Sequence, residues 1–289
     1  MGGVTTPALA AAVARRGGLG MIAAAGMGAG AVAARTAAAM EAAGPDARIG
    51  VGFLVPFLDD AALASAASVA SVIELFYGDP VVAPVRRAHD AGALVAWQVG
   101  SLDEALAAAD AGCDLVVVQG REAGGHVRGT VELLPLLRAV RARLDLPLVA
   151  AGGIGSGAAV AAALGAGADA VRIGTRLVAT LESDAHPAYV DALIAASARD
   201  TVITEAFAQG WPDAPHRVLR SCVASDVDPA LRSPSPPTRT STGDVASAAL
   251  YAGASVTDVT TIESAATVID ELVRDASAAM SRAVRERER

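Results

Sequence analysis

One loop holds the residues with the clearest capacity for chemistry. It reads Gln119-Gly-Arg-Glu-Ala-Gly-Gly-His126-Val-Arg-Gly129 and follows an apolar run that is typical of a strand. Histidine changes its charge near neutral pH, so His126 can accept a proton or orient a substrate. The alternative is a loop histidine bonded to backbone. The adjacent glycines, which let backbone approach a ligand closely, favour the functional role.

Two charged residues of this loop each allow two interpretations. Glu122 is either a second carboxylate of a site or a solvated loop charge, and Arg128 either binds an anion or faces solvent. The sequence leaves both alternatives open, and His126 is the one catalytic candidate.

Two glycine-rich segments follow later apolar runs. The first is Ala150-Ala151-Gly152-Gly153-Ile154-Gly155-Ser156-Gly157, and the second is Val171-Arg172-Ile173-Gly174-Thr175-Arg176. Either segment alone is a weak signal, since tight turns need glycine. Together, after the last two strands, they predict backbone N–H groups arranged around a phosphate.

The elements that must position these loops alternate strand with helix. The expected strands are Leu19–Ala24, Ile49–Leu54, Ser71–Phe76, Leu94–Val99, Asp114–Gln119, Pro147–Ala151 and Ala168–Ile173. The expected helices are Pro7–Arg16, Ala31–Ala43, Asp60–Ser68, Pro80–Ala91, Leu102–Ala111, Val131–Leu144 and Gly157–Gly165. This alternation predicts an α/β fold with a parallel sheet. The regular repeat favours a TIM-type (β/α)8 barrel with seven of its strands present over an open doubly wound sheet.

The pattern changes after Thr180. A helix is expected over His186–Ala198, an extended segment over Thr201–Phe207, a loop over Asp228–Asp244 and a terminal helix over Asp258–Arg289. We therefore expect a barrel in residues 1–207 and a C-terminal helical and loop cap in residues 208–289 that packs on it.

Composition excludes several classes of protein. All 23 basic residues are arginines, which rules out a Schiff-base lysine and a Walker A loop. Net charge is −8 and aromatic residues are 3% of the chain, so a nucleic-acid partner is not expected. No His, Cys, Asp or Glu cluster has metal-ligand spacing, so we expect no metal.

The expected compartment is the cytoplasm. Cys113 and Cys222 are isolated, and the start of the chain lacks the pattern of a signal peptide. The uncharged stretch Gly17–Ala34 is mostly Gly and Ala, so a membrane span is not expected.

The segments GGVTTPALAAAVARRGGLG, QGREAGGHVRG and AAGGIGSGAAVAAALGAGADAVRIGTRLVATLES together resemble the nitronate monooxygenase family, formerly called 2-nitropropane dioxygenases. The resemblance spans Met1 to about Phe207 and, more loosely, Tyr251–Ile269. It implies an FMN-dependent barrel that oxidises alkyl nitronates with O2 as electron acceptor. The FMN-dependent enoyl-ACP reductases have a similar histidine loop, so an NAD(P)H-dependent enoyl-thioester reductase is the second hypothesis. A non-catalytic flavin-binding barrel is the third.

Carried over by position, the resemblance implies roles for nine residues. His126 would stand over the flavin ring as a base or a substrate-orienting group. Gln119 and Gly124 would lie along the flavin, and the backbone of Gly152 and Gly153 would approach the FMN phosphate. The phosphate site would be completed by Arg172, Ile173, Gly174 and Thr175.

The sequence also departs from the family pattern. Gly52 stands where the family usually has Asn, and Arg128 stands where a glycine often follows the histidine. The family begins with an apolar strand that runs into a Met before two glycines, and here that Met is residue 1. The resemblance therefore implies that the first barrel strand is missing from these 289 residues, and two explanations stay open: a misassigned start, or a non-catalytic or oddly paired barrel. An exposed strand edge would then invite pairing between copies of the chain.

Overall fold

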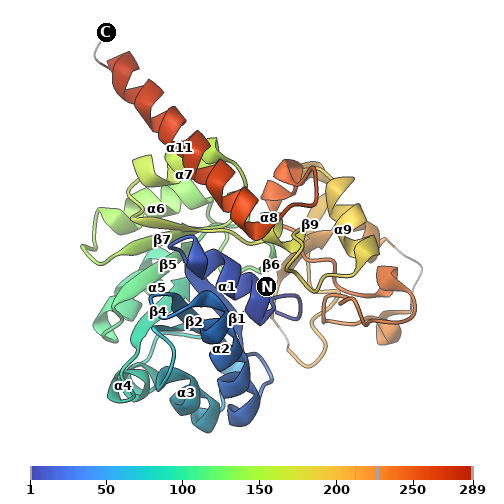
Figure 1. Ribbon diagram of the computed structural model, residues 1–289, viewed down its shortest axis with the longest axis horizontal. Helices are drawn as coiled ribbons and strands as arrows, with labels where there is room; N and C mark the ends of the chain where they lie inside the picture. The colour runs from blue at the N-terminus through green and yellow to red at the C-terminus, as the bar shows by residue number, and fades with distance from the viewer. Residues whose placement is uncertain (1, 212, 225–227, 288–289) are drawn as a thin grey trace.

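The computed structural model describes residues 2–211, 213–224 and 228–287. Figure 1 shows two lobes, a larger one that contains a parallel sheet and a smaller one on the side of α9 and β9. Met1, on which the expectation about the first strand depends, lies outside the described residues.

The larger lobe is built on a seven-stranded parallel sheet that curls into part of a barrel. Its strands are β1 (Leu19–Ala23), β2 (Arg48–Leu54), β3 (Val72–Phe76), β4 (Leu94–Val99), β5 (Leu115–Gln119), β7 (Leu148–Ala151) and β8 (Ala170–Arg172). They pair in the order β1-β2-β3-β4-β5-β7-β8, so each strand lies beside the next along the chain. A doubly wound sheet would reverse its order partway. The barrel-type α/β fold predicted from the sequence is confirmed.

The first helix of the larger lobe precedes β1, and each later one follows a strand of the sheet. These helices are α1 (Pro7–Arg15), α2 (Ala29–Ala43), α3 (Asp60–Ala67), α4 (Val82–Asp90), α5 (Leu102–Asp110), α6 (Leu133–Arg141), α7 (Gly157–Gly165) and the short α8 (Thr175–Val178). Side chains cap several of these helices at their N-termini. Thr6 accepts from the Leu9 N–H, Ser101 from Glu104 and Ser156 from Ala159.

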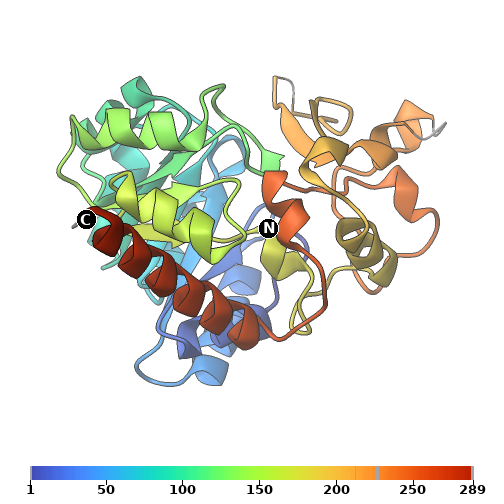
Figure 2. The same cartoon turned by 90° about the horizontal axis from the view of Figure 1, so that it is seen from above.

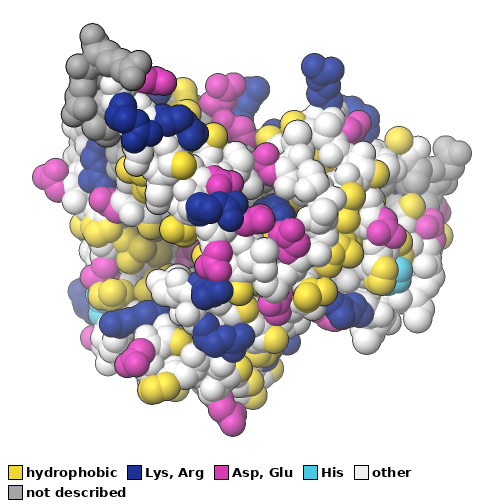
Figure 3. All heavy atoms as spheres, turned by 45° about the horizontal axis from the view of Figure 1, so that its top comes forward, with side chains coloured by type: hydrophobic (Ala, Val, Ile, Leu, Met, Phe, Trp, Pro, Cys, Tyr) yellow, Lys and Arg dark blue, Asp and Glu magenta, His cyan; other side chains and the backbone are white. Residues whose placement is uncertain are grey.

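The two faces of the sheet differ because side chains alternate along each strand. The face covered by helices carries fully buried apolar residues: Ile22, Val51, Ile73, Leu75, Val95, Trp97, Val116, Val118 and Leu148. The concave face carries a separate small cluster of Val72, Ala96, Val117 and Ala151. Leu94, on this concave face, is 51% exposed. Figure 3 shows hydrophobic side chains gathered in a hollow of the larger lobe.

The smaller lobe has its own hydrophobic core, formed by Val4, Val178, Tyr189, Leu193, Phe207, Val218, Leu250 and Val256 with their neighbours. Its elements are α9 (Pro187–Ile194), α10 (Arg220–Val223) and a three-stranded antiparallel sheet in the order β6-β10-β9. In this sheet β6 (Gly125–His126) comes from the larger lobe's histidine loop, and β9 (Thr201–Thr204) and β10 (His216–Leu219) come from the smaller lobe. The lobes thus share a sheet. Short 3-10 turns cover 55–57, 198–200, 229–231, 245–247 and 254–258.

The last helix, α11 (Ala265–Arg287), returns to the larger lobe. Its residues Ala265, Val268, Leu272 and Ala276 join the larger core, and it packs on α7 and α1. Figure 2 shows it running across α7, away from the smaller lobe. An ion pair of 2.6 Å between Arg16 and Asp270 fastens it to the end of α1. The division of the chain at residue 207 stays a prediction.

No helix within the described residues is long and apolar enough to span a membrane. The uncharged stretch 17–34 instead forms β1 and the start of α2.

Candidate functional site

The histidine loop leaves β5 and is held by the side chain of Gln119. The amide nitrogen of Gln119 donates to the carbonyl oxygen of His126 at 2.9 Å, and its oxygen accepts from the Arg128 N–H at 2.9 Å. Gln119 is 3% exposed. The residue expected along the flavin is therefore also the internal brace of the loop.

The charges of this loop are paired. Arg128 forms ion pairs with Glu104 at 2.6 Å and with Asp79 at 2.7 Å, and its guanidinium lies 5.5 Å from the ring centre of Tyr77. The Glu122 carboxylate accepts from the backbone N–H of Leu133 at 3.1 Å. Arg128 is thus paired with carboxylates and Glu122 accepts from a backbone group, which are contacts that neither pair of alternatives had named.

A chain crossing from the smaller lobe lies directly on this loop. A Cβ at Gly124 would collide with the backbone of Ala252 and Gly253, so only glycine permits this approach. The Ala254 N–H donates to the Glu122 carbonyl at 2.9 Å, and the Gly253 N–H donates to the Thr175 hydroxyl at 3.0 Å. Segment 252–254 therefore ties the histidine loop to the second glycine-rich segment.

Aromatic rings surround His126. Its ring centre lies 4.2 Å from Trp211, 5.3 Å from His216, 5.6 Å from Tyr77 and 5.9 Å from Tyr251. Burial, with a smaller effect from His216, lowers the pKa of His126 from 6.5 to about 4. Within the described residues neither ring nitrogen of His126 has a hydrogen-bond partner, and neither is fully buried. A neutral imidazole is thus held by its neighbours with its nitrogens available.

No site role was predicted from the sequence for any of these four neighbours, Tyr77 included. Trp211, His216 and Tyr251 lie more than 80 residues beyond His126 along the chain. They meet it because β10 pairs antiparallel with β6, with His216 opposite His126. A pairing between distant segments leaves no local signal in the sequence, so no role was predicted for His216.

The first glycine-rich segment turns at the carboxyl end of β7. Gly152 and Gly153 have φ values of +106° and +70°, which L side chains rarely adopt. A Cβ on Gly153 would also lie 3.0 Å from the Glu122 side chain. The chain then enters α7. The backbone turns here as expected for a phosphate loop, and a Cβ at either glycine would press on the histidine loop at Gly120, Glu122 or Ala123.

The second segment ends β8 beside the first. Gly174 precedes α8 and has open space around it, and Thr175 is 7% exposed. The Ile173 side chain packs against the larger hydrophobic core, so only its backbone can face a cofactor. Because parallel strands end at one edge of the sheet, the two segments and the histidine loop lie at the same end of the barrel.

The side chain of Arg172 is paired within the larger lobe, and the predicted part of this residue in a phosphate site stays a prediction. Arg172 shares the concave face with its partner in the register, Ala151, and its guanidinium pairs with the Glu74 carboxylate and with the Gln98 oxygen at 2.7 Å. Glu74 and Gln98 are each 6% exposed. The side chain therefore crosses the concavity from an edge strand to the middle of the sheet.

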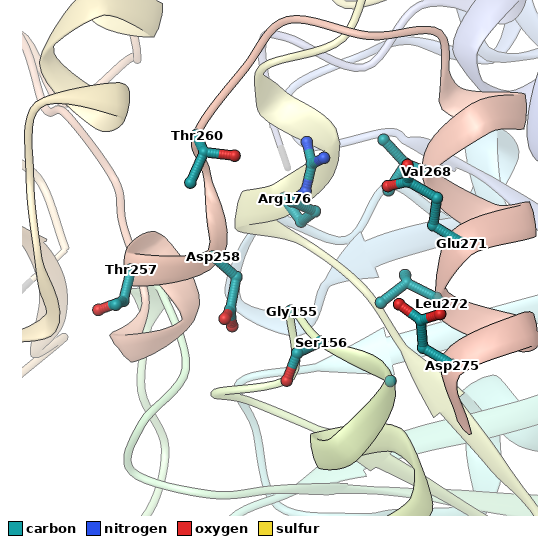
Figure 4. A pocket seen from close by; sticks show the side chains of 11 residues that line it. Gly155, Ser156, Arg176, Thr257, Asp258, Thr260, Val268, Glu271, Leu272 and Asp275 are labelled. Carbon is teal, nitrogen blue, oxygen red and sulfur yellow. The ribbon is translucent and has the colours of Figure 1, made fainter. Parts of the chain in front are cut away.

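A cavity of about 290 Å³ lies behind the first glycine-rich segment, between α7, α8, segment 257–260 and α11. Figure 4 shows Arg176, Asp258 and Ser156 among its walls. Arg176 is 6% exposed and pairs with Glu263 at 3.2 Å, while its second terminal nitrogen has no partner within the described residues. The same cavity is also lined by the carboxylates of Asp258, Glu271 and Asp275, so the free donor of Arg176 lies among acidic groups. No group of three or more metal-ligating side chains occurs in the described part of the chain.

Comparisons with known proteins agree with this geometry. Residues 46–275 match the family described as nitronate monooxygenase. Nitronate monooxygenase npaC of Metarhizium robertsii is 42% identical over 130 residues, which is 40% of this chain and 36% of that protein. The chain spans less than half of the length of the curated relatives it matches.

Two solved structures are similar over nearly the whole chain. A mutant of FabK from Thermotoga maritima has a TM-score of 0.86 at 30% identity and covers 98% of this chain and 92% of its own. Nitroalkane oxidase from Streptomyces ansochromogenes has a TM-score of 0.80 at 28% identity, with 97% and 94% covered.

Proposed function

Because the chain belongs to the nitronate monooxygenase family, we propose that it is an FMN-dependent oxidoreductase that oxidises alkyl nitronates with O2 as electron acceptor. The observation that carries the proposal is the placement of His126. It is a neutral imidazole with accessible nitrogens, at the end of the barrel where both glycine-rich segments turn.

The residues present fit the cofactor. The backbone of Gly152, Gly153 and Gly174 would surround the phosphate, with the Thr175 hydroxyl beside them and Arg176 supplying a cationic donor. Thr175 accepts one hydrogen bond from Gly253 and keeps its own O–H to donate. When bound, FMN would supply the electron transfer from substrate to oxygen.

His126 would orient the substrate. A group with a pKa of about 4 holds a proton poorly at neutral pH and is a weak general base there. A neutral imidazole still has one N–H, which can donate to the negatively charged oxygens of a nitronate. Between the two roles implied by the resemblance, the surroundings of His126 favour orientation by hydrogen bonding.

The test is an absorbance spectrum of the purified protein, followed by oxygen uptake with a panel of alkyl nitronates. We expect a yellow protein with bound FMN that consumes oxygen when nitronate is added. A colourless protein that takes up no added FMN would overturn the proposal.

The second candidate keeps the same cofactor and loops. The similarity of the histidine loop to that of FMN-dependent enoyl-ACP reductases favours an NAD(P)H-dependent enoyl-thioester reductase. Anaerobic mixing separates the two reactions. Bleaching of the flavin by nitronate but not by NADH supports the monooxygenase, and rapid bleaching by NADH supports the reductase. If neither bleaches bound FMN, the chain is a flavin-binding barrel without turnover.

A further inference from the structure

We propose that His216 is a positioning residue: by closing the loop between β9 and β10, it holds Trp211 against His126 and keeps the His126 ring oriented and partly buried. The inference rests on the proposed function for the importance of His126, but its geometry is independent of any cofactor.

Both ring nitrogens of His216 are bonded to backbone of one loop. Nδ1 lies 2.9 Å from the Ala214 carbonyl, and Nε2 lies 3.3 Å from the Phe207 nitrogen. A carbonyl only accepts and a backbone N–H only donates, so His216 carries its proton on Nδ1. The ring is fully buried at 0% exposure. A second proton on Nε2 would face the Phe207 N–H, so His216 stays neutral and does not act as an acid or base.

These two bonds set the shape of the loop. Phe207 begins it and Ala214 lies near its end, so one side chain fixes both of its arms. The loop is also joined to the histidine loop, because the Val127 N–H donates to the Pro215 carbonyl at 2.9 Å. The conformation of the described residues 207–211 and 213–216 is therefore tied to the position of His126.

This loop places the Trp211 ring against His126. The two rings lie 4.2 Å apart, centre to centre, with 31° between the planes. Phe57 also packs edge-on against Trp211, with 5.1 Å between the ring centres. The Tyr77 hydroxyl donates to the Asp213 carbonyl at 3.2 Å, which anchors the same loop to the end of β3. Stacked and edge-on contacts of this kind fix ring orientation.

Burial is the main influence on the pKa of His126, because the titratable groups that face it carry no charge at neutral pH. They are Tyr77 after β3, His216 on β10 and Tyr251, with Arg128 and Glu205 acting on Tyr77 and His216. Burial raises the pKa of Tyr77 to about 12 and lowers that of His216. These neighbours are therefore uncharged at neutral pH. If the loop opened, more water would reach His126 and its pKa would return toward 6.5.

The first experiment is nitrogen NMR of histidine-labelled wild-type protein, with signals assigned through single variants. We expect His216 to be neutral at pH 7 with its proton on Nδ1, and His126 to titrate near pH 4. A His216 that carries its proton on Nε2, or whose pKa is not lowered from 6.5, overturns the proposal without any variant.

The second experiment compares His216→Phe with His216→Asn. The phenyl ring keeps the volume but loses both bonds, whereas the Asn amide can still donate to the Ala214 carbonyl. In His216→Phe we expect the His126 pKa to rise by about one unit or more, with greater acrylamide quenching of Trp211 fluorescence. His216→Asn should show a smaller change in both.

His186→Asn is the matched control. His186 caps α9 through Nδ1 at 3.1 Å from the Ala188 nitrogen and does not belong to the cluster. Since asparagine is also a good cap, this variant should leave Trp211 and His126 unchanged. Trp97, the other tryptophan, is fully buried and bonded to the Gly78 carbonyl, so its emission is subtracted with a Trp211→Phe sample.

A folded His216→Phe protein with unchanged Trp211 quenching and unchanged His126 pKa overturns the proposal. If that variant does not fold, the wild-type tautomer and the His216→Asn protein decide. None of these measurements uses turnover. Failure of the proposed function would appear separately, as absence of FMN binding or of oxygen uptake.

Discussion

The amide of Gln119 and the backbone of His126 form one rigid unit: the Gln119 nitrogen donates to the His126 carbonyl at 2.9 Å, while its oxygen accepts from the Arg128 N–H two residues on. The Gln119 side chain thus bonds to the backbone on both sides of Val127. It keeps one N–H and one lone pair for a cofactor, so its predicted place along the flavin stays compatible with this brace.

Replacing Gln119 by Leu should disorder the histidine loop. The buried carbonyl of His126 and N–H of Arg128 would lose their partners, so we expect the free energy of unfolding to fall by about 2 kcal/mol. The value of kcat/KM should fall about tenfold or more through misplacement of His126. Urea unfolding and steady-state oxygen uptake measure the two effects.

Ser68→Ala is the control for that change. The Ser68 hydroxyl also donates to a backbone carbonyl, that of Ser65 at 2.9 Å, but it is exposed at the end of α3. Its loss should leave kcat/KM unchanged. Equal effects of the two substitutions would contradict a specific role of Gln119.

His126→Ala should abolish most turnover and retain FMN. Loss of a positioned hydrogen-bonding or proton-transfer group lowers kcat by about 10²–10⁴-fold, whereas the phosphate cradle lies on other loops. In wild-type protein the active form has neutral His126, so activity should fall only as pH drops through about 4. An acid limb near pH 6.5 would show that His126 is not buried as described.

Replacing His126 by a side chain that does not titrate should stabilise the protein at acidic pH. The pKa of His126 is about 4 in the fold and 6.5 by default, so between these values the unfolded chain binds a proton that the folded chain does not. Protonation of His126 therefore does not affect the free energy of unfolding above pH 6.5. As pH falls to 4 it lowers that free energy by about 3 kcal/mol in total. His126→Gln should flatten this part of the curve, measured by urea unfolding at pH 7 and pH 4.5. The same slope in variant and wild type would assign it to other groups.

Breaking the ion pair across the concave face should destabilise the sheet. Arg172→Met leaves the Glu74 carboxylate buried without its cation, and one-sided loss of a buried pair costs about 3 kcal/mol or more. The double variant Arg172→Met with Glu74→Gln should recover part of that loss. A thermodynamic cycle from urea unfolding gives the coupling between the two residues. Additive effects would mean that the pair contributes nothing.

Gly52→Asn should tighten binding of FMN. Gly52 stands on the concave face, and a Cβ there would meet its nearest atom, a Glu74 oxygen, at 3.6 Å, an ordinary contact. The resemblance implies an Asn contact to the cofactor at this position. A lower Kd from quenching of flavin fluorescence is expected, with Gly50→Asn as the control. At Gly50 a Cβ would lie 3.1 Å from the Val72 carbonyl oxygen and also press on Met21, so that variant should lose stability instead.

Sequence patterns predicted the larger lobe closely because its signals are local. All seven strands are found within about two residues of their expected bounds, as with Leu94–Val99, and α7 begins and ends where expected. Apolar runs mark strands covered by helices, and Ala-Gly at helix ends marks the turns.

The missed parts depend on geometry between distant segments. Strand alternation places Arg172 on the concave face, opposite in direction to Val171, and this could have been read from the sequence. Its partners Glu74 and Gln98 could not, since they lie on strands that the curl of the sheet brings near. The same holds for Trp211, His216 and Tyr251 around His126.

The return of α11 to α7 and α1 has a consequence for how the chain is made. The smaller lobe is an insertion between α8 and α11, so a ribosome completes it before it supplies the helix that covers Gly157 and the Ala-rich face of α7. During synthesis the Ala-rich face of α7 therefore stays uncovered until residues 265–287 leave the ribosome. Cleavage that removed this helix would expose the larger lobe's core while leaving the smaller lobe's chain whole.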